Sequence, residues 1–281
     1  MGRPERPVIG FLTDFGLDGA AATCRGVILG ICRDAQIVDI SHTIRKYAIR
    51  DGSYLLRSSL PYLPVGVHLA VVDPGVGTER RPVAVRVGRG DILVGPDNGL
   101  LVPPAEALGG VEGVRVLENR AFWLPQTTSS TFHGRDVFAP VTAHLAAGSA
   151  AFEDLGPEVA AESLVRIEPA TVRAEAGTLE TVITYVDSFG NLRLAGDADV
   201  LRTAFGALEP GATLTVEFAA NGSGTPIRER TTFATTFGDV PRGAPILYVD
   251  SSGRLAFADN QGNAAARLRI EPDRRARITR D

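Results

Sequence analysis

The chain has 281 residues, of which 44% are hydrophobic and 22% are charged, and its formal net charge at pH 7 is −4. This length allows two domains with sizeable cores, and the composition is that of a globular protein. The acidic balance, without a basic cluster, disfavours a nucleic-acid partner. No apolar run approaches the roughly 18 residues that a membrane span needs, and no signal peptide precedes the first predicted strand, so we expect a cytoplasmic protein without membrane contact.

Strand-like and helix-like segments alternate in the first half of the chain. Apolar residues recur at helical spacing in the two predicted helices, whereas the predicted strands are short apolar runs. The predicted helices are 20–32 and 49–60. The predicted strands are 8–12, 36–40, 67–72, and a hairpin formed by 83–87 and 91–94. This alternation predicts an α/β domain with a mainly parallel central sheet.

The two cysteines, Cys24 and Cys32, lie in the first predicted helix. Buried free thiols are expected there rather than a disulfide. Two cysteines are also too few for a zinc site.

The segment 71–81 combines the end of a buried strand with an acid and a glycine turn. An apolar run ends at Asp73, and Gly75 and Gly77 follow before Arg80. Open α/β sheets place ligand sites at such strand ends, and glycines allow the backbone to approach a ligand closely. Arg80 can fold back toward Asp73 across the turn. The alternative is a structural turn in which Asp73 caps a neighbouring N–H group.

His133 lies in the polar segment 131–136, which opens the last predicted helix of this half, 137–147. Residues 129–131 are Ser or Thr and can cap that helix, so His133 is expected beside a helix N-terminus. This location disfavours a charged imidazolium and suits the binding of an anion or oxyanion. The structural alternative is a polar residue in a capping turn.

The second half of the chain changes character after the segment 148–177, which contains prolines and short polar stretches and is typical of a connection between domains. Short strands separated by glycine-rich turns, with little helix, predict a small β-barrel or sandwich. The predicted strands are 179–187, 213–218 and 246–249. The predicted division is an α/β domain at 1–165, a linker at 166–176 and a β-barrel domain at 177–281.

Together these stretches resemble the S-adenosylmethionine hydroxide adenosyltransferase family, whose members are related to the fluorinating and chlorinating enzymes. The resemblance runs in order from Thr13-Asp14-Phe15-Gly16 to Gly262-Asn263-Ala264-Ala265, across both predicted domains. It implies an N-terminal α/β domain, a C-terminal β-barrel and a homotrimer. In that assembly the substrate lies between the N-terminal domain of one subunit and the barrel of its neighbour.

The resemblance also implies a reaction, in which water or hydroxide attacks C5′ of the ribose of S-adenosyl-L-methionine and releases adenosine and L-methionine. The sulfonium already activates the leaving group, so no acid, metal or other cofactor is expected. The site must remove a proton from water, align the oxygen with the C5′–S bond and exclude bulk solvent. The Asp, Arg and His that mark the hydroxide-using branch fall on Asp73, Arg80 and His133, which are expected to hold and polarise one water.

Acidic and hydroxyl residues of the family's substrate site also have counterparts in this sequence. Asp14 matches the carboxylate that binds the ribose hydroxyls. Asp18 and Asp187 match acids that face the methionine ammonium group. Ser251 matches a donor to the methionine carboxylate.

Contacts to the nucleoside rings are implied for one aromatic of the first half and three residues of the second. Tyr47 matches a residue that packs on the ribose, whereas Phe189, Asn191 and Phe233 match the adenine pocket, where rings stack and the amide reads the base edge. Core packing is an equal alternative for Tyr47 and Phe233.

The sequence departs from the related halogenases at several positions. Gly134 replaces the serine that binds halide, its neighbour His133 replaces a tyrosine, and the halogenase insertion after Val87 is absent, which all point away from halide use. Ser252 replaces an arginine that helps to bind the methionine carboxylate. Ala256 stands where many hydroxide-branch relatives carry an acid. Substrate affinity is therefore expected to be weaker, or backbone N–H groups supply these contacts.

Three alternative functions are considered. A non-catalytic module that holds S-adenosylmethionine or adenosine does not need the Asp73, Arg80 and His133 set. A halogenase is disfavoured by the departures above. A calcium-dependent nucleoside hydrolase is suggested by Asp14 and Asp18, but it requires a denser acidic cluster than these two residues supply.

Overall fold

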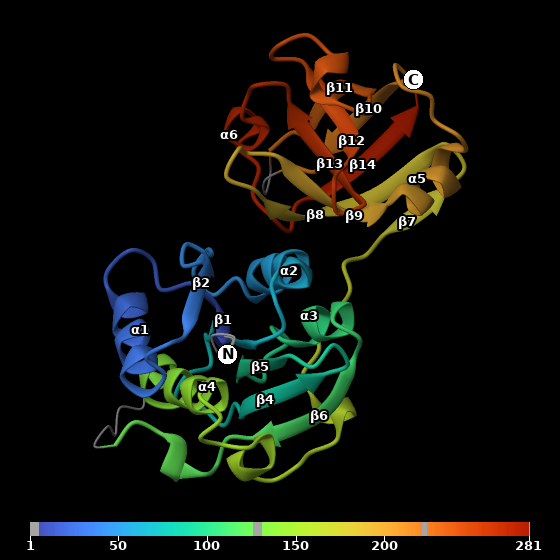
Figure 1. Ribbon diagram of the computed structural model, residues 1–281. Helices are drawn as coiled ribbons and strands as arrows, with labels where there is room; N and C mark the ends of the chain where they lie inside the picture. The colour runs from blue at the N-terminus through green and yellow to red at the C-terminus, as the bar shows by residue number, and fades with distance from the viewer. Residues whose placement is uncertain (1–5, 126–130, 221–223, 281) are drawn as a thin grey trace, which may run out of the picture. The chain divides into compact units, whose positions relative to one another are not determined.

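The computed structural model describes residues 6–125, 131–220 and 224–280. The chain forms two compact units, Met1–Ile167 and Glu168–Asp281, an α/β fold and a β-barrel (Figure 1). The N-terminal unit contains, in chain order, β1 (Val8–Thr13), α1 (Ala20–Ile31), β2 (Gln36–Ser41), α2 (Ile49–Ser59), β3 (Val67–Val71), β4 (Pro82–Val87), β5 (Ile92–Pro96), α3 (Val102–Ala107), β6 (Val111–Val116) and α4 (Ala139–Ala146). The elements predicted in this half are confirmed to within a few residues, whereas α3 and β6 lie outside the predicted segments.

The central sheet of the N-terminal unit has the strand order β2-β1-β3-β5-β4-β6. β1 pairs in parallel with β2 and β3, and β3 pairs in parallel with β5. β4 runs antiparallel to both β5 and β6. The expectation of a mainly parallel sheet is therefore too strong, because the predicted hairpin reverses the chain at β4 and β6 extends that antiparallel edge.

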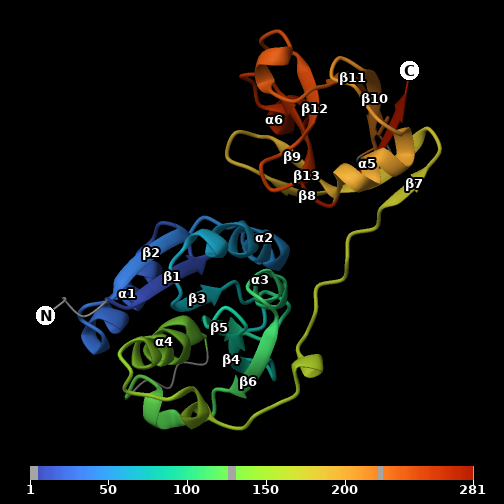
Figure 2. The ribbon, with the colours of Figure 1, turned by 45° about the vertical axis from the view of Figure 1, so that its right-hand side comes forward.

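Helices cover both faces of this sheet, with α1 and α4 on one face and α2 and α3 on the other (Figures 1 and 2). Successive side chains of a strand point to opposite faces. Ile9 and Phe11 of β1 therefore pack against the α1 and α4 side, whereas Leu12 packs against the α2 and α3 side. Burial on both faces explains why β1 and β3 are continuous apolar runs rather than alternating ones.

The order of the strands creates a switch point beside β1. The chain passes from β1 through α1 to β2 on one side of β1, and then through α2 to β3 on its other side. Thr13 at the end of β1 lies opposite Val71 at the end of β3. Ligand sites of open α/β sheets lie at such switch points, at the carboxyl ends of the strands. The fold therefore brings the segments that follow β1 and β3, with Asp14 and Asp73, to one edge of the sheet.

The C-terminal unit is built mainly from β-strands. It contains β7 (Arg173–Glu175), β8 (Thr178–Val186), β9 (Leu192–Asp197), α5 (Ala198–Phe205), β10 (Thr213–Phe218), β11 (Ile227–Phe233), β12 (Pro245–Val249), β13 (Arg254–Asp259), α6 (Ala264–Leu268) and β14 (Arg275–Arg280). The strand order is β14-β10-β11-β12-β13-β9-β8-β7, and β14 also pairs with β8. This additional pairing closes the sheet into a barrel of seven strands and excludes the sandwich (Figure 2).

Both cysteines are free and buried, as predicted. Burial raises the pKa of the Cys24 thiol to about 12. The thiolate is the reactive form of cysteine, so Cys24 is chemically inert in the folded protein at neutral pH.

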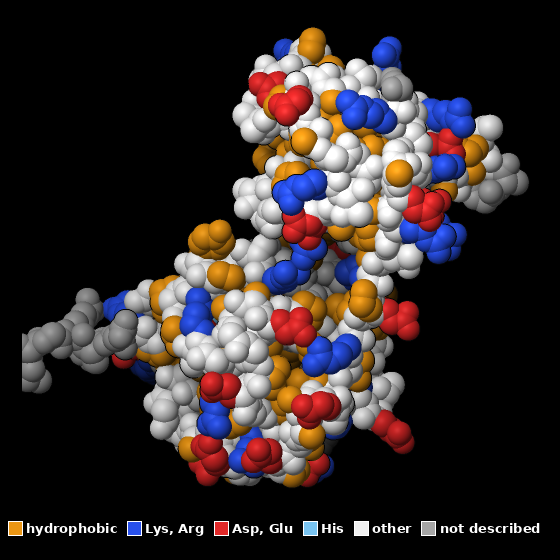
Figure 3. Space-filling view, turned by 90° about the vertical axis from the view of Figure 1, so that its right-hand side faces the viewer, with side chains coloured by type: hydrophobic (Ala, Val, Ile, Leu, Met, Phe, Trp, Pro, Cys, Tyr) orange, Lys and Arg blue, Asp and Glu red, His pale blue; other side chains and the backbone are white. Residues whose placement is uncertain are grey.

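Charged side chains of both signs are interspersed on the face of the molecule drawn in Figure 3. This mixture agrees with the small net charge of −4. Within the described residues, the structure contains no helix with the length and apolar character required to cross a bilayer.

Candidate active site

The three residues at the centre of the sequence prediction lie together in the N-terminal unit. Arg80 donates from Nε to Oδ1 of Asp73 over 3.1 Å, and its NH2 group forms an ion pair with Oδ2 of Asp73. The same NH2 group lies 3.1 Å from Nδ1 of His133. The side chains of Asp73 and Arg80 are 5% and 6% exposed. The guanidinium therefore joins the carboxylate and the imidazole in one buried cluster.

The turn after β3 explains how Arg80 returns to Asp73. Gly77 has a φ of 79°, in the left-handed region that favours glycine. The Thr78 hydroxyl donates to the carbonyl of Gly75 over 2.7 Å and accepts from the main-chain N–H of Arg80. These contacts reverse the chain immediately before Arg80. The alternative in which Asp73 only caps a neighbouring N–H group does not account for its two-point contact with the guanidinium.

His133 is the N-cap residue of a π-helical turn, Gly134–Phe138, which continues into α4. Its position beside a helix N-terminus is confirmed. The N-cap residue is His133 itself, and its own side chain makes no capping hydrogen bond. Of the three cap candidates, 129 and 130 lie outside the described residues. Burial and the neighbouring Arg80 charge hold the pKa of His133 below its ordinary value.

Asp14, the first residue after β1, is held from two directions. Its Oδ2 atom accepts the main-chain N–H of Tyr47 over 2.9 Å, and its main-chain carbonyl accepts from Nζ of Lys46 over 2.8 Å. Only 7% of the residue is exposed. This geometry leaves the Oδ1 atom of Asp14 available to a ligand.

A cavity of about 310 Å³ is lined by Asp14, Asp73 and His133, whereas Arg80 lies behind its wall, in contact with Asp73 and His133. Four of the predicted site residues, Asp14, Tyr47, Asp73 and His133, contribute to its wall. The cavity is also lined by Phe15, Ala20, Lys46, Val71, Val76, Thr131, Phe132 and Gly134. Asp18 does not belong to this lining; it is exposed and close to Gly16, where an added Cβ would lie 3.0 Å from its Oδ1 atom. Tyr47 is 69% exposed, so core packing is excluded for this residue.

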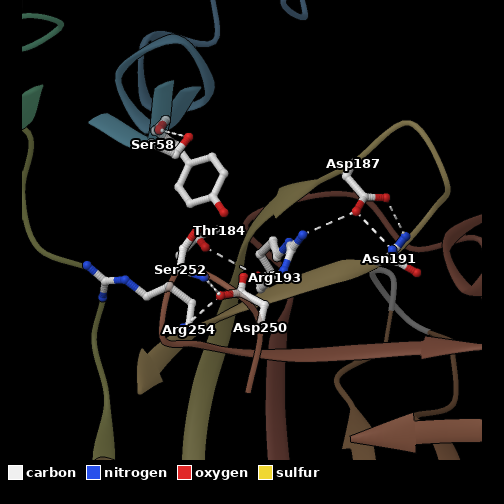
Figure 4. Close-up of polar contacts among 9 residues, drawn as sticks. Ser58, Thr184, Asp187, Asn191, Arg193, Asp250, Ser252 and Arg254 are labelled. Carbon is white, nitrogen blue, oxygen red and sulfur yellow. Dashed lines mark hydrogen bonds and ion pairs between the residues drawn. The ribbon is translucent and has the colours of Figure 1, made fainter. Parts of the chain in front are cut away.

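Three of the predicted residues of the C-terminal unit, Asp187, Phe189 and Asn191, lie in the turn between β8 and β9, and Figure 4 shows Asp187 and Asn191. Oδ1 of Asp187 accepts the main-chain N–H groups of Phe189 and Asn191 over 2.9 and 3.0 Å. Oδ2 accepts from Nδ2 of Asn191 over 2.9 Å. Arg193 lies between Asp187 and Asp250 and forms ion pairs with both. Asp187 therefore organises this turn and shares the Arg193 guanidinium with Asp250.

The other predicted residues of this unit divide between surface and core. Phe189 is 75% exposed, and Ser251 is exposed in the turn before β13, so both are accessible to a ligand. Phe233, at the end of β11, packs against the hydrophobic core of the barrel. Phe233 is only partly buried in this position.

Several residues that contact the predicted site escape the sequence reasoning. Nδ2 of Asn98 donates to the carbonyl of Val72 over 2.8 Å, immediately before Asp73. The hydroxyl of Thr13, which accepts the N–H of Phe15, lies 2.9 Å from Nδ1 of His42. The sequence gives only a local signal for these residues. Asn98 and His42 both follow strands in polar turns, where any single residue is ordinary turn chemistry. Lys46 and Arg193 are the other additions, and only Lys46 carries a compositional signal.

A larger groove of about 540 Å³ lies on the C-terminal unit, along β8, β10 and β14, and has none of the predicted site residues in its wall. Its charges alternate across the strands, because Glu180 lies opposite Arg173 and Arg277, and Arg277 lies opposite Glu217. In such a ladder the acidic and basic side chains pair with one another across the strands. It does not have the chemistry of a nucleoside site.

Comparison with known proteins decides the family. Residues 9–156 match the SAM hydroxide adenosyltransferase N-terminal domain, and residues 181–277 match the C-terminal domain of the same family. The chain belongs to the SAM hydroxide adenosyltransferase family. It is 44% identical over 275 residues to the (R)-S-adenosyl-L-methionine hydrolase of Salinispora tropica, which covers 97% of this chain and 98% of the relative.

More distant members of the family include halogenating enzymes. The fluorinase of Actinopolyspora mzabensis is 29% identical over 312 residues, with 98% of each chain covered. The crystal structure of an uncharacterized conserved protein from Thermotoga maritima superposes with a TM-score of 0.85 at 33% identity, over 97% of this chain and 100% of that one. The architecture seen here is thus that of a SAM hydroxide adenosyltransferase along its whole length.

Proposed function

We propose that this SAM hydroxide adenosyltransferase hydrolyses S-adenosyl-L-methionine to adenosine and L-methionine. The observation that carries the proposal is the buried cluster of Asp73, Arg80 and His133 beside the cavity that also exposes Asp14. The resemblance to hydrolases at 37–44% identity supports the same reaction. A purely binding protein does not require a guanidinium that contacts a buried carboxylate on one side and an imidazole on the other.

The reaction requires a bond to form between a water oxygen and C5′ while the C5′–S bond breaks. Methionine leaves as a neutral thioether, so the charge of the sulfonium disappears and no acid is needed. The water must lose one proton as the C–O bond forms. The contribution of the protein is to hold the water in line and to accept that proton, which typically gives about 10²–10⁴ in rate for the acid–base component.

The cluster assigns distinct tasks to its members. Nδ1 of His133 is occupied by Arg80, so the imidazole presents its Nε2 atom to other groups. NH1 of Arg80 is buried without a hydrogen-bond partner among the described residues, and is the donor left for a water oxygen. The carboxylate of Asp73 keeps unused lone pairs beyond its two contacts with Arg80. We therefore assign Asp73 as the proton acceptor, with Arg80 and His133 as the residues that orient the water.

The substrate is bound by groups from both units. Oδ1 of Asp14 accepts a ribose hydroxyl, and the exposed ring of Tyr47 covers the sugar. Asn191 and the exposed ring of Phe189 contact the adenine, and the exposed Ser251 donates to the methionine carboxylate. Asp18 is the better candidate for the methionine ammonium group, because Asp187 is already paired with Arg193.

The assembly that completes this site is a homotrimer, in which one subunit supplies the α/β residues and its neighbour supplies the barrel residues. Mixing two inactive variants, His133→Ala and Asn191→Ala, tests the arrangement after partial denaturation and reassembly. Recovered activity in the mixture supports a shared site, because some sites then receive two intact halves. No recovery, with a trimer present by light scattering, contradicts it.

The configuration at sulfur is a further part of the proposal. Relatives at 37–44% identity are named for the (R) sulfonium epimer. We expect this protein to consume the (R) epimer in preference to the (S) epimer. Chiral chromatography of an epimeric mixture, sampled during turnover, measures the preference directly.

The decisive experiment is incubation with S-adenosylmethionine in ¹⁸O-labelled water, with chelator present and with product analysis by mass spectrometry. Adenosine labelled at its 5′-oxygen, together with unlabelled methionine, establishes water attack at C5′. Adenine and S-ribosylmethionine, formed in a parallel incubation with calcium in place of the chelator, would indicate a nucleoside hydrolase. Bound substrate that stays intact would indicate a binding module.

A further inference from the structure

Lys46 is the only lysine among the 29 lysine and arginine residues of this chain. It lies in the wall of the cavity that contains Asp14, Asp73 and His133. Every other member of this basic set is an arginine. The only lysine of the chain therefore lies in the wall of a cavity that several predicted site residues also line.

Lys46 and Tyr47 together hold Asp14 at both ends. Nζ of Lys46 donates to the main-chain carbonyl of Asp14 over 2.8 Å, and the main-chain N–H of Tyr47 donates to Oδ2 over 2.9 Å. Nζ also lies close to the adjacent turn, because a Cβ built on Gly16 would be 3.6 Å from it. The ammonium group is thus placed directly beside Asp14.

The backbone around Lys46 is fixed in an unusual conformation. Tyr47 has a φ of 66°, which is rare for a bulky residue and marks a segment held by its surroundings. The residue before Lys46, Arg45, donates to both oxygens of Asp51 over 2.7 and 3.1 Å. The side chain of Asp51 is 3% exposed in the first turn of α2. The segment that carries Lys46 is therefore anchored to the fold by a second contact besides Asp14.

The chemistry of this pair fits a vicinal diol. A hydroxyl group donates one hydrogen and accepts through its lone pairs. Oδ1 of Asp14 can accept the hydrogen, whereas the ammonium group of Lys46 has three donors and directs one of them to the Asp14 carbonyl. The remaining donors can reach the lone pairs of the same hydroxyls. A compact ammonium suits this position better than a planar guanidinium, whose donors form a rigid fork.

We propose that Lys46 is a specificity residue that recognises the ribose hydroxyls together with Asp14. This inference rests on the proposed function for the identity of the substrate, but the ligand class that it names is any adenosine derivative with a free ribose diol. It predicts that Lys46 acts on binding and on discrimination between ribose and deoxyribose. It assigns Lys46 no part in proton transfer.

The test compares Lys46→Met with the wild-type protein. We expect KM for S-adenosylmethionine to rise about ten- to a hundredfold, as for loss of a hydrogen bond to a charged group, with kcat changed by less than about threefold. The preference for the normal substrate over its 3′-deoxy analogue should shrink by a similar factor. Arg33→Met is the matched control, because Arg33 is exposed and lies outside the cavity lining.

A binding measurement separates this inference from the proposed function. Reductive methylation with ¹³C-formaldehyde labels Lys46 as the only side-chain amine of the chain, and Lys46→Arg identifies its NMR signal. A shift of that signal with adenosine, and a smaller one with 3′-deoxyadenosine, supports the inference even if S-adenosylmethionine is not hydrolysed. Equal shifts, no shift, or an equal loss of affinity for both nucleosides in Lys46→Met would overturn it.

Discussion

Arg80 and His133 are both basic, yet NH2 of the guanidinium lies 3.1 Å from Nδ1 of the imidazole. Arginine can only donate hydrogen bonds, so Nδ1 of His133 must accept. The ring is therefore neutral and carries its proton on Nε2. Burial and the Arg80 charge lower the pKa of His133, which is consistent with this tautomer. The contact thus decides which edge of the imidazole is presented to a ligand.

Protonation of His133 should abolish its contact with Arg80, so activity should fall on the acid side. Because the pKa of His133 is below the ordinary value of 6.5, the enzyme should keep its activity at pH 6.5 and lose it at lower pH. His133→Ala should reduce kcat by about 10²–10⁴. A pH profile of kcat/KM and the ¹⁵N shifts of His133 check these statements. A half-loss of activity above pH 6.5 that is absent from His133→Ala would contradict the neutral tautomer.

Arg80→Lys retains the positive charge but removes the planar fork that contacts Asp73 at two points and His133 at a third. We expect kcat to fall by about 10²–10³, as on loss of a positioned donor. Arg86→Lys is the control, because its partner Glu153 is exposed and the pair lies on the surface. Steady-state kinetics with both variants distinguishes the loss of geometry from a general effect of replacing arginine. Wild-type turnover in Arg80→Lys would show that charge alone is sufficient.

Gly134→Ser restores the residue type that the halogenases carry at this position. A Cβ at Gly134 would lie 2.7 Å from Cζ of Phe15, so the ring must move out of the cavity wall. We expect a loss of about 1–3 kcal/mol in unfolding free energy, a lower kcat and no 5′-chloroadenosine when chloride is present. Gly26→Ser is the control, because nothing lies within 4 Å of a Cβ there. Denaturant unfolding and mass spectrometry of the products provide the measurements, and a chlorinated product would show that this one residue selects the nucleophile.

A second polar cluster is buried in the N-terminal unit, away from the cavity lining. Nδ1 of His68 accepts the main-chain N–H of Gly10 over 3.1 Å, and Nε2 lies 2.9 Å from Oδ1 of Asp91. Asp91 also accepts from Nε and NH2 of Arg89 over 2.7 and 2.9 Å. Burial raises the pKa of Asp91, but the hydrogen bonds from His68 and Arg89 outweigh it and hold the pKa below its ordinary value.

Asp91→Asn should cost about 1–3 kcal/mol at pH 7, because it removes the buried carboxylate that accepts charge-assisted hydrogen bonds from Arg89 and a hydrogen bond from His68. The folded pKa of Asp91 is below the unfolded value of about 3.9, so its stabilisation is complete above that pH and is lost as the pH falls further. The difference between variant and wild type should therefore narrow below about pH 4. Unfolding free energies between pH 3 and 7 test this, with Asp199→Asn in an exposed ion pair as the control. A difference that stays constant across this range would assign the effect to packing.

The sequence predicts the centre of the candidate site because the residues that carry the proposed chemistry there also occupy recognisable structural positions. Asp73 follows a strongly apolar strand, Arg80 follows a turn with two glycines, and His133 precedes Gly134, so each leaves a local pattern. Phe233 has no such distinction, since an aromatic residue in a strand packs into the core as readily as it binds a base. Lys46 lies in an irregular turn without periodicity. Only a count of basic residue types singles it out.

The strands of the barrel are harder to predict for a related reason. β9, β11 and β14 contain several charged residues, three of them consecutive in β11, and their identity as strands depends on partners far along the chain. The mixture of parallel and antiparallel pairs in the N-terminal sheet is hard to predict for the same reason. A hairpin is visible locally, but the strand beside which it inserts is decided by tertiary packing.

The closure of the barrel by β14 has a consequence for the order in which the chain folds. β14 pairs with β10 on one side and with β8 on the other, so the ring cannot close until residues 275–280 are available. During synthesis the α/β unit, which uses only earlier residues, can acquire its core first. A ribosome-stalled chain that ends just before β14 would display two unpaired strand edges. We expect chaperones to bind most strongly to nascent chains of that length.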